Sequence, residues 1–310
     1  MDEQPPVAAV DIGGTKTLIE VFAGDSTEPL ASVESHTARS GDIAGAIAKG
    51  IRHVAGVRDV RAVGVASPGP LDPIEGVVLN PPNLSRRWWG LRLTDEVAHR
   101  LDAPVSLEND GNLGALGEWA YGAGAGYGSV LYVTVSTGVG TGLVTDGEIF
   151  GGNRGFAVEL GHTVIEPSGP VCGCGRSGCV EVLSSGTAIA RRASRMGWST
   201  SAGEPDARAV AAAAEDGDRV ARVVLDEAAS YLGKALVNFI YCFDPEAVVI
   251  GGGVSRSALF MQLVEEAVSR EPMMDAFRGV PVLTAALTGR SVIHGARALA
   301  EKAAGYDLRG

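Results

Sequence analysis

Long hydrophobic runs are missing from this sequence. The longest apolar stretches, SVLYVTV at 129–135 and AVVIGGG at 247–253, fall far short of the ~18 to 20 residues that a membrane-spanning helix needs. The first residues, MDEQPPVAAVDIGG, include acidic residues and prolines where a secretory signal would have basic residues and then an apolar segment. We therefore expect a cytoplasmic protein without a membrane segment.

Basic residues are in the minority. The 310 residues include 26 Lys and Arg against 37 Asp and Glu, which gives a formal net charge of −11. Because phosphate backbones are bound by clustered Lys and Arg, this balance argues against nucleic acid as the main partner. An acidic protein that binds a polyphosphate ligand would need backbone amides, a few cations and Mg²⁺.

Polar low-complexity tracts and linkers rich in proline or glycine and serine are also absent, so the chain is expected to fold as an ordinary globular protein. Its length favours two lobes over a single core. Strands that alternate with helices predict an α/β protein. We expect a small lobe at 1–115, joined by the C-terminal helix at about 293–310, and a large lobe at 116–292.

The main expected elements follow from hydrophobic periodicity and glycine turns. Two β runs around a glycine turn are predicted at 7–24 and again at 130–147. The other predicted elements are strands near 61–66, 104–109, 247–251 and 281–286, and helices near 42–56, 110–122, 181–195, 206–215, 219–243 and 291–303.

Cysteine is scarce, yet three of the four cysteines lie within VCGCGRSGCVE at 171–181. Disulfides are uncommon in a cytoplasmic chain of this size, and the C-x-C-x4-C spacing is not that of a redox pair. Three thiolates and one imidazole can instead bind a tetrahedral Zn²⁺. We predict a zinc site at Cys172, Cys174, Cys179 and His162, and we expect Cys242 to be a small buried core residue.

Three glycine turns could bind phosphates, although each alone could equally be structural. Glycine turns and helix N-termini present backbone N–H groups to anions. The first turn follows Asp11, which could orient Mg²⁺, and contains Gly13, Gly14, Thr15 and Lys16. The others contain Thr137 with Gly138, and Gly251 with Gly252. No Walker loop is present, and G-x-G-x-x-G does not occur in the expected place.

The segment ENDGN offers a candidate catalytic carboxylate. Asp110 lies where a strand passes into a helix, so it could be a helix cap. From the same position a carboxylate can also take a proton from a hydroxyl nucleophile. Farther along, Glu159, His162 and Glu181 flank the cysteine cluster, and a metal there would bring them together into a polar pocket suited to a ligand rich in hydroxyls.

Nine motifs in this order resemble the ROK family of sugar kinases and repressors, most closely its bacterial glucokinases. The motifs are VDIGGTK, GVASPGPLD, PPNL, ENDGN, STGVGTGLV, ELGH, CGCGRSGCVE, SSGTAIA and VVIGGGVS. The resemblance implies a two-lobed actin-like, hexokinase-like (ribonuclease H-like) fold with a structural zinc loop. It also implies a homo-oligomer, a dimer or tetramer, that transfers a phosphoryl group from ATP to a hexose.

The resemblance also implies residue roles. Asp110 is similar to the general base that takes the proton of the sugar 6-hydroxyl, and Asn109 to a sugar ligand beside it. Further implied sugar ligands are Asn83, Glu159, His162 and Glu181. Two departures from the usual motifs are NDGNLGALGE, and Val158 in GFAVELGH, where a small residue is usual beside Glu159; the second bears on sugar preference.

Three alternatives to a glucokinase stay open at this point. An N-acylhexosamine kinase is the nearest rival. A sugar-responsive repressor would carry a helix-turn-helix module before the first glycine turn, where only ten residues precede Asp11. A sugar-binding regulator without catalysis is disfavoured because Asp11, Lys16 and Asp110 are all present. Polyphosphate also remains open as the phosphoryl donor.

Overall fold

The first sheet is built from buried β runs of the N-terminal half. The computed structural model describes all residues except 1–3, 25, 57, 200–202, 204 and 309–310. Its five strands are Val7–Ile12 (β1), Lys16–Phe22 (β2), Ala31–His36 (β3), Val63–Ser67 (β4) and Val105–Asn109 (β8). The strand order is β3-β2-β1-β4-β8. β1, β4 and β8 are parallel, whereas β2 pairs antiparallel with β1, and β3 pairs antiparallel with β2.

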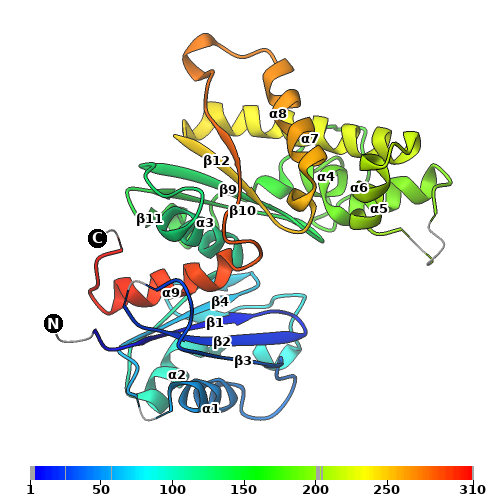
Figure 1. Ribbon diagram of the computed structural model, residues 1–310. Coiled ribbons are helices and arrows are strands. Elements are labelled where there is room, and N and C mark those ends of the chain that lie inside the picture. The colour runs from blue at the N-terminus through cyan, green and yellow to red at the C-terminus, as the bar shows by residue number, and fades with distance from the viewer. Residues whose placement is uncertain (1–3, 25, 57, 200–202, 204, 309–310) are drawn as a thin grey trace. The chain divides into compact units, whose positions relative to one another are not determined.

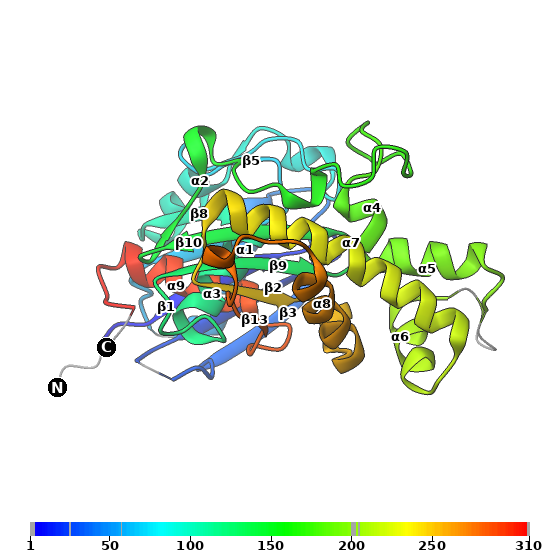
Figure 2. The same cartoon turned by 90° about the horizontal axis from the view of Figure 1, so that it is seen from above.

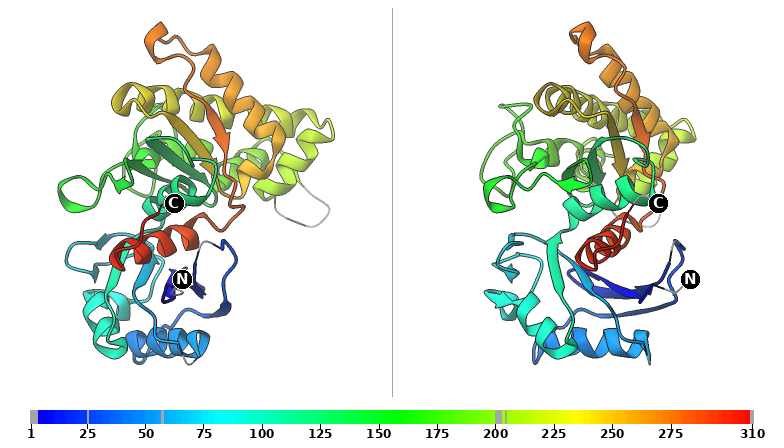
Figure 3. Two further views of the ribbon diagram at one scale, coloured as in Figure 1. Left: turned by 60° about the vertical axis from the view of Figure 1, so that its left-hand side comes forward. Right: turned by 90° about the vertical axis from the view of Figure 1, so that its left-hand side faces the viewer.

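Helices cover both faces of this sheet (Figures 1 and 3). Ile43–Ala55 (α1) and Leu93–Leu101 (α2) lie against one face, where their apolar residues form a core with β1, β4 and β8. Ser291–Ala303 (α9) lies on the other face and packs against Asp110–Tyr121 (α3). The parallel strands therefore have the two covered faces that such sheets require.

Glycines allow α3 and α9 to approach closely. A Cβ on Gly117 would collide with the backbone of Ser291, and a Cβ on Gly295 would collide with the backbone of Leu113. Any larger residue at either position would force the helices apart. Gly117, in ENDGNLGALGE, therefore has a packing role in the helix that begins with Asp110.

The second sheet has the order β11-β10-β9-β12-β13. Ala247–Gly251 (β12) pairs in parallel with Ser129–Val135 (β9) and with Val282–Thr284 (β13). Val139–Thr145 (β10) pairs with Glu148–Ile149 (β11). The long helix Arg219–Phe243 (α7) packs against Gly186–Arg195 (α5), Ala207–Glu215 (α6) and Ala258–Arg270 (α8), as Figure 2 shows for α5 and α6.

The chain divides into two compact units, and the division passes through β10. One unit comprises residues 1–126, 142–157 and 290–310, and the other comprises 127–141 and 158–289. The predicted lobe boundary at 115 stays a prediction.

The remaining short elements are Leu71–Asp72 (β5), Val77–Val78 (β6), Leu91–Arg92 (β7), Val180–Ser184 (α4) and the 3₁₀ turns Arg86–Trp88 (η1), Gly152–Arg154 (η2), Leu160–His162 (η3), Val254–Arg256 (η4) and Asp275–Phe277 (η5).

Most predicted elements are confirmed, and two expectations are wrong. The helix expected at 181–195 is two helices, because Ser185 ends α4 and caps α5 by accepting a hydrogen bond from the N–H of Ala188. Cys242 is exposed rather than buried. It lies two positions, or about 200°, beyond the buried Ile240 on α7, so it projects from the opposite face. In the described part of the chain, no helix is both long and apolar enough to cross a membrane.

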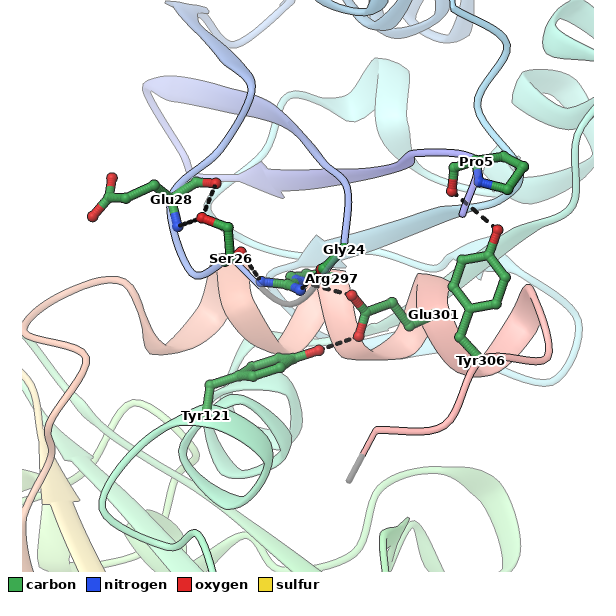
Figure 4. Close-up of polar contacts among 8 residues, drawn as sticks. All are labelled: Pro5, Gly24, Ser26, Glu28, Tyr121, Arg297, Glu301 and Tyr306. Carbon is green, nitrogen blue, oxygen red and sulfur yellow. Dashed lines mark hydrogen bonds and ion pairs between the residues drawn. The ribbon is translucent and has the colours of Figure 1, made fainter. Parts of the chain in front are cut away.

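The buried side chain of Arg297 connects α9 to residues that follow β2 in the chain. Arg297 is 1% exposed, its Nε donates to Glu301 at 2.7 Å, and its remaining nitrogens donate to the carbonyls of Gly24 and Ser26 (Figure 4). The guanidinium carbon also lies 4.6 Å from the ring centre of Tyr121, whose hydroxyl donates to Glu301. The buried charge is thus fully surrounded by partners.

Arg297→Ala should therefore destabilise the first unit. Removing one member of a buried ion pair leaves the other charge uncompensated, which costs about 3 to 5 kcal/mol of unfolding free energy. Thermal and urea unfolding measure the loss. Arg297 pairs with one carboxylate in the core, whereas Arg92 pairs with two, Glu75 and Asp95, at the surface, so Arg92→Ala is a control that should change stability little. Equal stability of both variants would contradict the assignment.

Candidate functional site

The junction of β8 and α3 presents the candidate base. Asn109 is the N-cap of α3, and its Oδ1 accepts a hydrogen bond from Gly111 N at 2.8 Å. Asp110 is the first helical residue, and its Oδ1 accepts from the same N–H at 2.8 Å. Asn109 therefore takes the N-cap position that the sequence left open for Asp110.

Asp11 lies near Asp110 at the carboxyl end of the parallel strands. It pairs with Ala66 of β4, which in turn pairs with Glu108 of β8. Burial raises the pKa of Asp11 to about 6, and the negative charge of Asp110 adds to the rise. Two neighbouring carboxylates at this edge of the sheet form a site that favours a cation or a proton.

Thr37 stabilises the first glycine turn through two hydrogen bonds. The Thr37 hydroxyl donates to Gly13 O at 2.7 Å, and Thr37 N donates to Thr15 O at 2.9 Å. The N–H of Gly13 is already bound to Lys16 O at 2.8 Å, so it is not available to a phosphate. Lys16 forms an exposed ion pair with Glu34, with 2.6 Å between Nζ and Oε1.

Asn83 lies against this same turn. A Cβ on Gly14 would be 3.0 Å from the Asn83 carbonyl oxygen, so a side chain at Gly14 would press on that backbone. Both residues line a cavity of about 240 Å³, together with Arg39 and Trp88. The predicted first phosphate loop and the predicted sugar residue Asn83 are therefore brought together within the first unit.

The second glycine turn, in the other unit, is supported by the start of α5. Ser136 N donates to Gly138 O at 2.9 Å, and Ser136 O accepts from Gly186 N at 2.7 Å. The Thr187 hydroxyl donates to Thr137 O at 2.7 Å. The SSGTAIA motif thus shapes the turn that contains Thr137 and Gly138.

Gly251 ends β12 and Gly252 follows it, so the predicted glycine turn comes directly after the strand. Gly252 has φ +92°, a conformation that glycine adopts readily, and a Cβ there would collide with the carbonyl of Val135. The Ser255 hydroxyl donates to Gly252 O at 3.0 Å, which holds the turn into η4. This turn therefore packs directly against the end of β9.

The three cysteines and His162 converge as predicted. Their ligand atoms all lie within 4.8 Å of one another. Cys172 Sγ is 3.6 Å from His162 Nδ1, and Cys174 Sγ is 3.6 Å from Cys179 Sγ. A tetrahedral zinc site with bonds of about 2.0 to 2.3 Å separates its ligand atoms by roughly 3.5 to 3.8 Å. The donor set and its spacing fit such an ion.

Glu181 joins this cluster to the second glycine turn. Its Oε1 is 3.9 Å from Cys172 Sγ, and its Oε2 accepts from Val139 N at 3.3 Å. A Cβ on Gly138 would be only 2.5 Å from Glu181 Oε2, so the absence of a side chain at Gly138 makes room for this carboxylate.

Glu159 lies in the same electrostatic environment. Shielding from water raises its pKa, the neighbouring His162 opposes the rise, and the negative charge of Glu181 adds to it. The preceding residue, Val158, is buried with φ +64°, a strained conformation for a β-branched residue. Strain beside a candidate ligand is typical of functional sites.

The structure therefore gathers the predicted residues into one group in each unit. Asp11, the first glycine turn, Asn83, Asn109 and Asp110 belong to the first unit, and the remaining predicted residues belong to the second. The sequence patterns predict no role for Thr37, Glu108 or Thr187. The signal for Thr187 was its place in SSGTAIA, whereas Thr37 lies in no recognisable motif.

Comparisons with known proteins identify the family of this chain. The sequence matches the ROK family over residues 7–303. A glucokinase from Thermotoga maritima is 38% identical over 285 residues, which cover 87% of this chain and 89% of that protein. An N-acetylmannosamine kinase from Yersinia pestis is 34% identical over 284 residues, which cover 88% of this chain and 91% of that one.

Crystal structures of relatives have the same fold. The ROK hexokinase from Thermus thermophilus is 35% identical with a TM-score of 0.84, covering 96% of this chain and 98% of its own. A ROK family glucokinase from Streptomyces griseus, in complex with glucose and AMPPNP, is 32% identical with a TM-score of 0.80, covering 96% and 99%. The expected α/β hexokinase-like fold is confirmed, and the chain belongs to the ROK family.

Proposed function

We propose that this ROK sugar kinase transfers the γ-phosphoryl group of ATP to the 6-hydroxyl of D-glucose. The observation that carries the proposal is the position of Asp110, at the start of a helix and beside Asp11 at the carboxyl edge of the sheet. The glucokinase relatives, one of which binds glucose and AMPPNP, support the substrate assignment.

Asp110 acts as the general base. It accepts the proton of the sugar 6-hydroxyl while that oxygen forms its bond to the γ-phosphorus and ADP leaves. Asn109 uses Oδ1 to cap α3, so its Nδ2 is the group that donates to a sugar hydroxyl. Asn83 supplies a further contact to the sugar from the first unit.

The glycine turns bind the nucleotide. Gly14, Thr15 and Lys16 contact phosphate oxygens, as do Thr137 and Gly138, and Gly251 with Gly252 lies on the adenosine side. Lys16 must exchange its exposed partner Glu34 for the phosphates, a small cost because exposed ion pairs are weak. Mg²⁺, held with the help of Asp11, would neutralise charge on the transferring phosphoryl group.

His162, Cys172, Cys174 and Cys179 would hold a structural zinc ion. Burial raises the pKa of the Cys179 thiol to about 12, so a bound cation is what would stabilise its thiolate. His162 faces Cys172 with Nδ1, which leaves Nε2 to bind a sugar hydroxyl. Glu159 and Glu181 bind further hydroxyls from either side of this loop.

An N-acylhexosamine kinase is the nearest rival, because an N-acetylmannosamine kinase is also among the relatives. A site built for hydroxyls can reject analogues that lack one by up to ~10⁴ to 10⁵. It excludes an added acetyl group only by lack of space. Val158 is buried beside Glu159, where a smaller residue is usual, and its larger side chain favours a site too small for the acetyl group.

A comparison of substrates tests the proposal. With ATP and Mg²⁺, kcat/KM should be highest for glucose in a series that includes mannose, fructose, N-acetylglucosamine and N-acetylmannosamine. Replacing ATP by polyphosphate should lower the rate. If an N-acetylated sugar leads the series, the glucose assignment is wrong although the kinase assignment stands.

A further inference from the structure

Glu108 is a buried carboxylate next to the candidate catalytic residues. It lies in β8 and is 8% exposed. The register places it in a row with Ala66 and Asp11 across the three parallel strands. Register partners in a parallel sheet point to the same face, so Glu108 shares the face of Asp11, away from the core residue Leu107.

The partners of Glu108 are both neutral N–H groups. Asn109 N donates to its Oε1 at 2.7 Å, and Asn112 Nδ2 donates to the same oxygen at 3.0 Å. Burial raises the pKa of Glu108, and these two donors oppose the rise. A carboxylate in this environment is costly compared with an apolar residue of the same size, which indicates a role other than stability.

The two hydrogen bonds span the first turn of α3. One donor, Asn109 N, precedes Asp110 in the sequence, and the other, Asn112 Nδ2, lies two residues after it. A single carboxylate oxygen therefore binds the chain on both sides of the candidate base. The Oδ1 atom of Asn112 has no hydrogen-bond partner within the part of the chain that the structure describes. The contact with Glu108 is therefore what orients this amide.

We propose that Glu108 is a positioning residue for phosphoryl transfer, whose Oε1 clamps the backbone of Asn109 and the side chain of Asn112 so that Asp110 meets the sugar hydroxyl. The inference rests on the proposed function of Asp110. Glu108 acts through the turn and contacts neither substrate. What it must supply is a hydrogen-bond acceptor at the position of Oε1, and its charge is dispensable.

This requirement separates two substitutions. Glu108→Gln keeps an acceptor oxygen of the same shape and should retain a kcat close to that of the wild type. Glu108→Ala removes the acceptor and releases both donors, and kcat should fall by about 10- to 100-fold, since displacement of a catalytic group by 1 Å costs as much. The Kd for glucose, measured calorimetrically, should change less than kcat. Asn112→Ala removes one of the two hydrogen bonds, so its kcat should lie between those of Glu108→Gln and Glu108→Ala.

A matched control removes the effect of stability. Glu301 is 9% exposed and accepts two hydrogen bonds, like Glu108, but it lies near the end of α9. Glu301→Gln should lower the Tm and leave the kcat of the folded enzyme unchanged. Assays are run well below each Tm, with the folded fraction measured by circular dichroism.

The outcomes are distinguishable. A low kcat in Glu108→Ala that is restored in Glu108→Gln supports the inference. If the wild type phosphorylates a sugar and Glu108→Ala has the same kcat per folded molecule, the role of Glu108 is overturned and the proposed function stands. The same holds if Glu108→Gln is as slow as Glu108→Ala. A wild type that phosphorylates no sugar overturns the proposed function, and this inference with it.

Discussion

Asp110→Asn should reduce kcat by ~10² to 10⁴ while glucose still binds. Asparagine keeps the size of aspartate and can still accept from Gly111 N, so the helix start should be preserved. It cannot accept the proton of the 6-hydroxyl. Single-turnover kinetics with ATP measure the chemical step, and calorimetric titration with glucose measures binding.

The matched control is Asp95→Asn. Asp95 also lies in the first turn of a helix of the first unit, α2, where it pairs with the exposed Arg92. Its substitution should leave kcat unchanged. If Asp110→Asn turned over at a near-normal rate, Asp110 would be reassigned to helix N-terminal stabilisation.

Loss of the metal site is expected to have the second large effect. Elemental analysis of the purified protein should find about one zinc per chain, as a four-ligand site requires. Cys174→Ser should lose the zinc together with most of the affinity for glucose, because His162 belongs to the same cluster and Glu181 Oε1 lies 3.9 Å from Cys172 Sγ. The Tm should fall as well, since metal binding and folding are coupled.

Cys242→Ser provides the comparison. Cys242 is an exposed thiol on α7 and not one of the four clustered ligands. Its substitution should leave the zinc content, the Tm and the affinity for glucose as in the wild type. A zinc-free preparation that is fully active would disprove the structural role of the metal.

Much of the fold could be predicted because its main elements have strong patterns. β1, β4 and β12 each begin with a short apolar run, VAAV, VGVA and AVVI, and α7 repeats apolar residues at helical spacing. β3 and α2 lacked such patterns. β3 is largely exposed, with the sequence ASVESH, and α2 begins at Leu93, where the N-cap residue Arg92 makes no side-chain capping hydrogen bond.

Parts of the candidate site could not be predicted for a related reason. The candidate metal ligands were recognisable because cysteine is rare and its side chain has few other uses in a glycine-rich loop. Glu108 had no such signal, since an acidic residue at a strand end is ordinarily exposed. Its burial, and its hydrogen bond from Asn112 one helical turn later, are seen only in the folded chain. Thr37 supports Gly13 from 24 residues away, a contact that no local pattern reveals.

The most direct measurement is the identity of the product formed by the purified wild-type protein. With glucose, ATP and Mg²⁺, phosphorus and carbon NMR should show glucose 6-phosphate appearing in step with ADP. One sugar phosphate per ATP consumed is expected, with phosphate on the 6-hydroxyl alone. Release of inorganic phosphate without a sugar phosphate, or phosphate on another hydroxyl of glucose, would contradict it.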